Sequence, residues 1–446
     1  MSDDIKGIPY STAEFDKKGA LIKAPSVPAD TTDLIVVSHG WNNDRQAAET
    51  LYRKLFENFA DLTAQDADIQ ARTIAIVGII WPSKKFDALM TESSALSPQA
   101  GGAAAAGGHV NKAASQAAMH AAIDRAAPLF DDADAAEKIA ALHNLIPQLE
   151  DDTDIQQEFV ETLRKLVEPT GLDAAEHSSN DGSVIFFEDS ADVVFERAAQ
   201  EPVAVPAAED SDAGNDEGAA AGLIGDLFSG ATRAVTSLLN LTTYYEMKKR
   251  AGTVGKNGVA PLIDRLAAQL GKLNRIHLVG HSFGGRLVTA AAANTLTDKI
   301  YSLVLLQAAF SHNGFSKTQN GFFRSMVDNQ RVKGPIVVTH TRNDTAVGRA
   351  YPLASRISGV NASSLGDAND VFGGIGSNGA QRMEDGEVVG AINALLPSGQ
   401  AYAWQPGKFH NLESSAFIVD PNGGDAHGFV YVPQVAWAIS RVIVSA

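Results

Sequence analysis

Cysteine is absent from the 446 residues of this chain. Its absence excludes disulfide bonds, a thiolate nucleophile and metal sites built on cysteine ligands. Long apolar runs are missing as well, because stretches such as Ile74–Trp81 are far shorter than the ~18 residues that a membrane-spanning helix requires. The N-terminal stretch is acidic and lacks the apolar region of a secretory signal. We therefore expect a soluble protein, cytoplasmic by default, with export by another route left open.

Basic side chains are fewer than acidic ones: the chain has 36 Lys and Arg and 53 Asp and Glu, which gives a formal net charge of −17. This balance argues against nucleic acid as a partner, because phosphate binding requires a basic surface. The acidity is concentrated in residues 150–226, which contain 21 acidic and 3 basic side chains. Such a segment could bind a cation or a basic partner, but a solvated, loosely ordered loop is the simpler interpretation.

Apolar, β-branched runs of strand length alternate with helical patterns along much of the chain. The runs are continuously apolar, which is typical of strands buried on both faces of a parallel sheet. The expected strands are Asp33–Val37, Thr73–Ile80, Arg275–Val279, Tyr301–Leu306 and Pro335–Thr339. The expected helices are Arg45–Phe59, Pro261–Leu270, Gly285–Leu296 and Val432–Val444. This order predicts an α/β fold with a doubly wound, mostly parallel sheet.

The alternation stops between residues 91 and 230, which we interpret as a large helical, acidic insertion that acts as a lid or cap. Residues 1–90 and 231–446 would then form the α/β core. Three features are expected inside the insertion: helices at Ala113–Leu149 and Asp154–Val167, a flexible small-residue tract at Gly101–Gly108, and a disordered or loose acidic segment at about 188–218.

One long amphipathic element is expected at Ala219–Arg250, where apolar residues recur at helical spacing. Packing of this stripe on the sheet is the simpler interpretation. The alternative is a lid helix that contacts a lipid interface.

The pattern Gly-x-Ser-x-Gly occurs at Gly280–Gly284, directly after an expected strand and before an expected helix. A tight turn between strand and helix strains the serine backbone, and small flanking residues keep the neighbouring chain clear. The hydroxyl of Ser282 would then point into a cleft at a helix N-terminus, where negative charge is stabilised. We predict that Ser282 is a nucleophile.

An oxyanion site requires backbone N–H groups close to the nucleophile. Phe283, the residue after the serine, is expected to supply one. His39-Gly40-Trp41 follows the first expected core strand, and Gly40 would let this loop fold toward the nucleophile so that Trp41 supplies the second.

An acid and a histidine should follow the nucleophile along the chain. Asp344 lies a few residues after the expected strand Pro335–Thr339, which suits an acid that orients an imidazole. Among eleven histidines, His427 lies in a glycine-flanked loop directly before the terminal helix, and we predict that it is the base. His410 is the alternative.

These elements resemble the α/β-hydrolase superfamily, specifically bacterial lipase- or esterase-like serine hydrolases. The matching residues are His39-Gly40-Trp41, Gly280-His281-Ser282-Phe283-Gly284, Asp344 and His427, in the order of that family. The resemblance covers roughly residues 1–90 and 230–446 and leaves the insertion unexplained.

The resemblance implies hydrolysis of a small or lipid-like carboxylic ester through an acyl-enzyme, without cofactor or metal. His39, Gly40, Phe310 and Phe315 are expected to line the substrate site, and the lid would be the point of contact with an interface. Two alternatives remain at this stage. The same triad could cleave amides or peptides, or the fold could serve as a non-catalytic binding protein.

Overall fold

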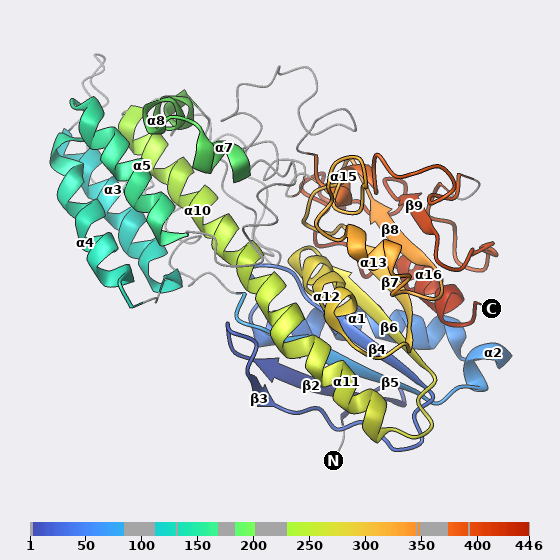
Figure 1. Cartoon of the computed structure of the whole chain (residues 1–446). Coiled ribbons are helices and arrows are strands. Elements are labelled where there is room, and N and C mark those ends of the chain that lie inside the picture. Colours follow the sequence, from blue (N-terminus) through green and yellow to red (C-terminus); the bar gives the residue numbers. More distant parts are fainter. Residues whose placement is uncertain are drawn as a thin grey trace.

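The computed structural model describes residues 3–83, 112–130, 133–167, 183–200, 230–344, 347, 373–390 and 393–445. Within these ranges the chain forms a nine-stranded mixed sheet in the order β1-β2-β5-β4-β6-β7-β8-β9, with β3 paired to β2 (Figure 1). The strands are β1 (Asp3–Ile5), β2 (Ile8–Phe15), β3 (Leu21–Lys23), β4 (Asp33–Ser38), β5 (Ile74–Ile80), β6 (Arg275–His281), β7 (Ile300–Leu306), β8 (Ile336–His340) and β9 (Phe409–Glu413).

The sheet is mostly parallel, as expected. All neighbours from β2 through β9 in the sheet order pair in parallel, while β1 and β3 pair with β2 antiparallel. All five expected strands are present. The sequence reasoning missed β1 to β3 and β9, because these strands carry polar residues and lack a continuous apolar run.

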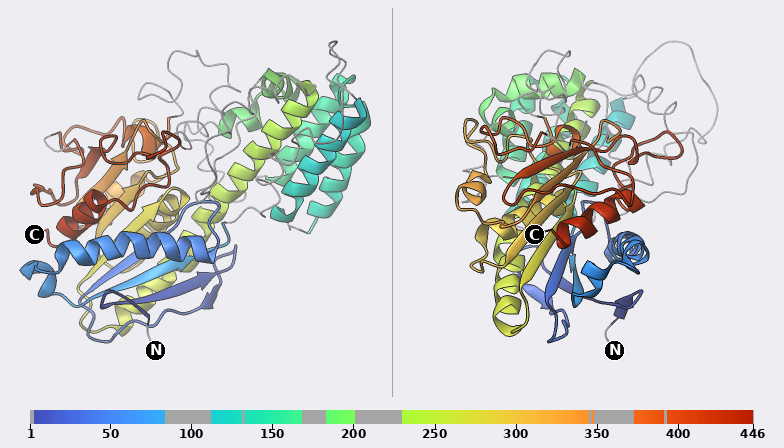
Figure 2. Two further views of the ribbon diagram at one scale, coloured as in Figure 1. Left: turned by 180° about the vertical axis from the view of Figure 1, so that it is seen from behind. Right: turned by 90° about the vertical axis from the view of Figure 1, so that its right-hand side faces the viewer.

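Helices cover both faces of the sheet. On one face lie α1 (Arg45–Thr63) and α16 (Pro433–Ile443), which pack against each other. On the other lie α11 (Ala260–Gln269), α12 (Phe283–Asn294) and the C-terminal half of α10 (Gly230–Val254), as Figure 2 shows from behind and from the side. Three short helices, α2 (Ala67–Gln70), α13 (Arg324–Asp328) and α15 (Ile375–Asn378), lie in the connections. The sheet therefore separates two apolar cores.

The N-terminal half of α10 carries a helical bundle beside the α/β core (Figure 1). The bundle contains α3 (Lys112–Ala126), α4 (Ala135–Leu145), α5 (Thr153–Leu166), α7 (Ser183–Glu188) and α8 (Ala191–Gln200). The helical pattern expected over Ala113–Leu149 thus forms two helices, and Pro128 lies in the 3-10 turn that ends the first. Such a turn is expected because proline cannot continue an α-helix.

Two expectations about the insertion need correction. Residues 191–200 form α8, whose apolar side chains Val194, Phe195 and Ala198 are buried against the bundle, so this part of the acidic segment is helical. In addition, α10 does not bury a single stripe, because side chains on several of its faces are covered by the bundle or by α12. Gly101–Gly108 and residues 201–229 lie outside the described residues.

The helix α10 continues through a π-helical turn at Gly255–Val259 into α11. This turn brings the chain against α12, because a Cβ on Gly255 would lie 2.2 Å from the carbonyl oxygen of Leu287. One helical element therefore connects the bundle to the helix that follows the Gly-x-Ser-x-Gly motif. In the described ranges, no helix is long and apolar enough to cross a lipid bilayer.

Candidate active site

Ser282 occupies the turn between β6 and α12 in a strained backbone conformation, with φ 55° and ψ −126°. A left-handed φ is unfavourable for a residue with a side chain and is found mainly where the surroundings enforce it. The flanking glycines allow this conformation, because a side chain at either position would collide with neighbouring backbone. A Cβ on Gly280 would lie 2.4 Å from the Gly284 carbonyl oxygen, and one on Gly284 would lie 2.3 Å from that of Ser38. The motif therefore makes the tight turn that the sequence reasoning required.

The loop after β4 lies directly against this turn. The strands β4 and β6 are parallel neighbours, with Ser38 opposite Gly280, so the segments that follow them leave the sheet at the same edge. Gly40 is so close that a Cβ there would lie 2.6 Å from Ser282 Cβ and 3.2 Å from its Oγ. The structure thus brings the predicted oxyanion loop to the predicted nucleophile.

Trp41 and Phe283, which are expected to supply the oxyanion donors, directly follow Gly40 and Ser282, the two residues in this contact. The rings of Trp41 and Phe283 pack edge to face, with centroids 6.0 Å apart. Phe283 begins α12, and an N–H in the first turn of a helix has no acceptor within that helix. The N-terminus of α12 therefore favours negative charge next to Ser282.

Asp344 and His427 form a buried pair. His427 Nδ1 lies 2.8 Å from Asp344 Oδ2, and the two residues are only 6% and 2% exposed. The Ala426 N–H also donates to the Asn343 carbonyl at 3.1 Å, which ties the loop before α16 to the segment that follows β8. Because a carboxylate accepts, Nδ1 carries the hydrogen and Nε2 is the basic nitrogen of the neutral ring.

Burial raises the pKa of Asp344, and the charge and hydrogen bond of His427 act in the opposite direction. The carboxyl group also accepts a hydrogen bond from the Val347 N–H at 2.8 Å. An acid held in this way orients the imidazole and stabilises its positive charge.

His281 connects this pair to the nucleophile turn. It is the last residue of β6, directly before Ser282, and its ring centroid lies 4.7 Å from that of His427. Its Nε2 lies 2.9 Å from the His427 carbonyl oxygen. Sequence reasoning treated His281 as structural, although its position inside the motif was the signal that could have identified it.

His410, the alternative base, is engaged elsewhere. It lies on β9, where its Nε2 accepts the Gln405 N–H at 3.1 Å and its ring packs at right angles on Trp404. The structure therefore pairs His427, and not His410, with Asp344.

Of the four residues expected to line the substrate site, only Gly40 lies against Ser282 in this way. The His39 ring is buried, stacks on Trp81 at 5.6 Å, and contacts the Gly40 carbonyl oxygen through Nδ1 at 2.9 Å. Burial lowers the pKa of His39 to about 4, so this imidazole is neutral near pH 7. His39 supports the loop from inside the core.

Phe310 and Phe315 are also in the core. Their rings pack on each other and on Phe323, and Phe315 also contacts Phe409, with centroid distances of 4.8 to 5.9 Å. They are 1% and 0% exposed. This placement does not support the predicted contact with an acyl chain.

Sequence reasoning missed Tyr244 as a neighbour of the site. This residue lies on α10, and its ring centroid is 5.2 Å from that of Phe283. Tyr244 contacts Tyr245, which in turn contacts Phe186 and Phe187 of α7. An unbroken series of aromatic contacts therefore links the bundle to the residue after Ser282.

A second Ser-His-Asp group lies toward the amino ends of β4, β6 and β7, whereas Ser282 follows the carboxyl end of β6. His277 Nδ1 lies 2.9 Å from Ser302 Oγ, and its Nε2 lies 3.3 Å from Asp33 Oδ1. Asp33 also forms an ion pair with Arg72 at 2.7 Å. Ser302, His277 and Asp33 are at most 2% exposed. The group is closed to substrates, and we interpret it as a structural network joining β4, β6 and β7.

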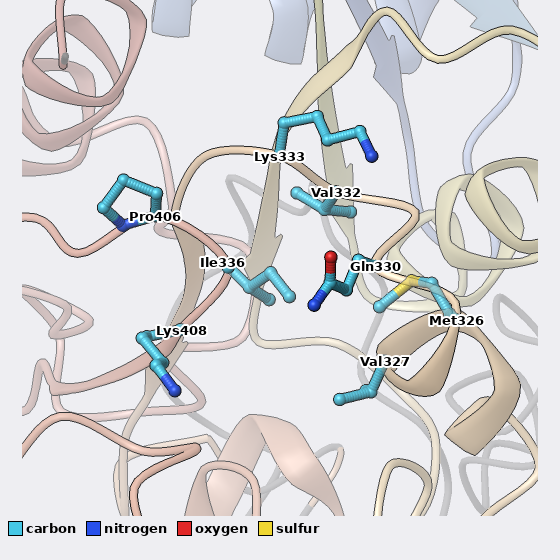
Figure 3. Close-up of a pocket in the computed structure, with 9 residues that line it drawn as sticks. Met326, Val327, Gln330, Val332, Lys333, Ile336, Pro406 and Lys408 are labelled. Atoms are coloured by element: carbon cyan, nitrogen blue, oxygen red, sulfur yellow. The ribbon is translucent and has the colours of Figure 1, made fainter.

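Two surface cavities lined by described residues lie away from Ser282. One of about 260 Å³ lies beside the first residue of β8, at the edge opposite Asp344, and Figure 3 shows Lys333 and Lys408 on opposite sides of it. Another of about 480 Å³ lies along the start of α1. Their linings contain none of Ser282, Asp344 and His427.

In the part of the chain that the structure describes, no group of three or more His, Asp or Glu is arranged to hold a metal ion. Comparisons with models of known protein families, with curated proteins and with solved structures found no match.

Proposed function

We propose that this chain is a serine hydrolase of the α/β-hydrolase superfamily that cleaves carboxylic esters. The observation that carries the proposal is the meeting of three chain segments at one edge of the sheet. Ser282 lies in a strained turn, Gly40 of the neighbouring loop lies against it, and the His427–Asp344 pair is joined to the same strand end through His281.

Each group has a definite task in this reaction. Ser282 Oγ attacks the ester carbonyl carbon while His427 Nε2 accepts the serine proton, and Asp344 stabilises the imidazolium that forms. The N–H groups of Trp41 and Phe283 bind the negative oxygen of the tetrahedral intermediate. His427 then donates the proton to the leaving alcohol, and an acyl-enzyme on Ser282 remains.

Water completes the cycle. His427 accepts a proton from water while the water oxygen attacks the acyl carbon, and His427 then returns this proton to Ser282 Oγ as the second tetrahedral intermediate releases the acid. The neutral tautomer required in both steps carries its hydrogen on Nδ1, which is the nitrogen that contacts Asp344.

The insertion, residues 91–230, serves in this proposal as a cap beside the site. Two observations support this role. The helix α10 belongs to both the bundle and the core, and Tyr244 on it contacts Phe283. Trp41, which is partly exposed beside Gly40, favours an apolar acyl group over a charged one.

Hydrolysis of p-nitrophenyl esters over a series of acyl lengths tests the proposal. We expect turnover by the wild type and none by Ser282→Ala, because the acyl-enzyme cannot form without the hydroxyl. Ser26→Ala is the matched control, since this serine is exposed and lies after β3. Thermal unfolding of all three proteins shows whether loss of turnover reflects loss of fold.

Retained turnover in Ser282→Ala would refute the assignment. A fluorophosphonate probe gives a second readout, because it labels an activated serine whichever substrate the enzyme prefers. Labelling of Ser282 without turnover of any ester would move the reaction to amide or peptide substrates. Absence of both would leave the non-catalytic alternative.

A further inference from the structure

We propose that His281 is a positioning residue that holds the loop carrying His427 against the nucleophile turn. The inference rests on the proposed function, because it concerns how the base is kept in place for Ser282. It assigns a task to the residue between Gly280 and Ser282 that neither attacks the substrate nor transfers a proton.

The hydrogen bond between His281 and His427 has only one direction. A backbone carbonyl oxygen can only accept, so His281 Nε2 must donate to the His427 oxygen at 2.9 Å. This requirement selects the tautomer with hydrogen on Nε2. The other ring nitrogen, Nδ1, is directed toward Gly40, where a Cβ would lie 3.3 Å from it. One imidazole thus lies between the predicted oxyanion loop and the loop of the base.

The surroundings keep this imidazole neutral. His281 is 2% exposed, and burial, followed by the neighbouring His427 and His39, lowers its pKa well below the ordinary value. The His427 carbonyl hydrogen bond acts in the opposite direction. A neutral donor can hold the His427 backbone without adding a second positive charge when His427 becomes protonated during the reaction.

The His427 loop lacks regular secondary structure and so needs contacts from outside. Its side chain is held by Asp344 at 2.8 Å, and its N–H contacts Asp425 Oδ1 at 3.3 Å within the loop. The bond from His281 joins the same residue to the last position of β6. Because Ser282 is the next residue, this bond joins the residue of the base directly to the strand end that carries the nucleophile.

The experiment compares two substitutions at one position. His281→Leu removes the donor, while His281→Gln places an amide nitrogen near the position of Nε2. With the best p-nitrophenyl ester, we expect kcat of the leucine variant to fall ~30- to 100-fold with KM within about threefold, because misplacement by about 1 Å can cost ~10² in rate. We expect the glutamine variant to recover most of this loss.

His410→Gln is the matched control, because it alters another buried histidine that contacts Trp404 and Gln405 and not the site. Amide hydrogen exchange in residues 420–431 adds a readout that does not depend on turnover. We expect faster exchange there in His281→Leu than in the wild type or in His281→Gln.

Wild-type kcat in His281→Leu would overturn the inference. Equal losses in the leucine and glutamine variants would also overturn it, because packing and not the hydrogen bond would then explain the effect. A wild-type enzyme that neither cleaves esters nor reacts with fluorophosphonate would refute the proposed function instead, and the exchange comparison would still decide whether His281 holds the loop.

Discussion

Substitution of Gly40 by alanine tests the geometry of the site most directly. The added methyl group would lie 2.6 Å from Ser282 Cβ, 3.2 Å from Ser282 Oγ and 3.3 Å from His281 Nδ1, whereas ordinary contacts are 3.4–4 Å. The overlap with Ser282 Cβ is therefore about 1 Å. Neither neighbour can withdraw easily, because the Ser282 backbone is strained and His281 is bonded to the His427 carbonyl.

The expected effect has two parts. Overpacking of this kind typically lowers the free energy of unfolding by ~1–3 kcal/mol. Displacement of Ser282 or of the predicted oxyanion donor by about 1 Å should lower kcat on p-nitrophenyl esters by ~10². The loss of activity should therefore exceed anything that the modest loss of stability explains at room temperature.

Urea unfolding and ester turnover, measured on the same preparations, separate the two parts. Gly271→Ala is the control, because a Cβ at that position meets nothing within 4 Å and Gly271 has no left-handed φ. If Gly40→Ala kept both wild-type kcat and wild-type stability, the loop after β4 would not lie against Ser282, and the reasoning about the oxyanion site would fail.

Three further predictions concern the Asp344–His427 pair, buried His39, and the network of His277 with Asp33. Asp344→Asn should keep the fold but lower kcat by ~10³–10⁴, because His427 loses the acceptor that selects its tautomer; an unchanged kcat would exclude Asp344 as the orienting acid. The pKa of His39 falls from 6.5 to about 4 on folding, so the unfolded chain binds the proton first, and this group by itself should lower the free energy of unfolding by about 2 kcal/mol between pH 7 and pH 5. Urea unfolding at both pH values checks this, and His39→Gln should weaken the pH dependence. His277→Leu should cost ~1–3 kcal/mol, because buried Asp33 and Ser302 each lose a hydrogen-bond partner although Asp33 keeps Arg72 and Thr32, yet leave kcat unchanged; a fall in kcat without a loss of stability would contradict a purely structural role.

Part of the candidate site could be predicted because its signals are local. Gly280, Ser282 and Gly284 are a short motif between a strand and a helix, and the close contacts of both glycines agree with the steric reason given for them. The position of Asp344 after β8 likewise follows from strand order. Continuously apolar runs identified the central strands because these strands are buried on both faces.

Other features could not be read from local pattern. The β1–β3 strands and β9 lie toward the two sides of the sheet and carry polar residues, so they lack a continuous apolar run. The helix α8 lies within an acidic, alanine-rich segment and packs on α10. Phe310 and Phe315 are apolar residues near a strand end. The sequence alone cannot tell a core ring from one that lines a site, since both require the same residue type.

The sequence by itself determined the α/β class, the central strands and the turn that holds Ser282, because burial and backbone strain leave local traces in composition and spacing. Only the tertiary structure decided that His427 and not His410 contacts Asp344, a pairing across 83 residues. It also decided that His281 reaches His427 and that Tyr244 reaches Phe283. Such contacts depend on how strands and loops meet at one edge of the sheet, and the chain brings those segments together only when it folds.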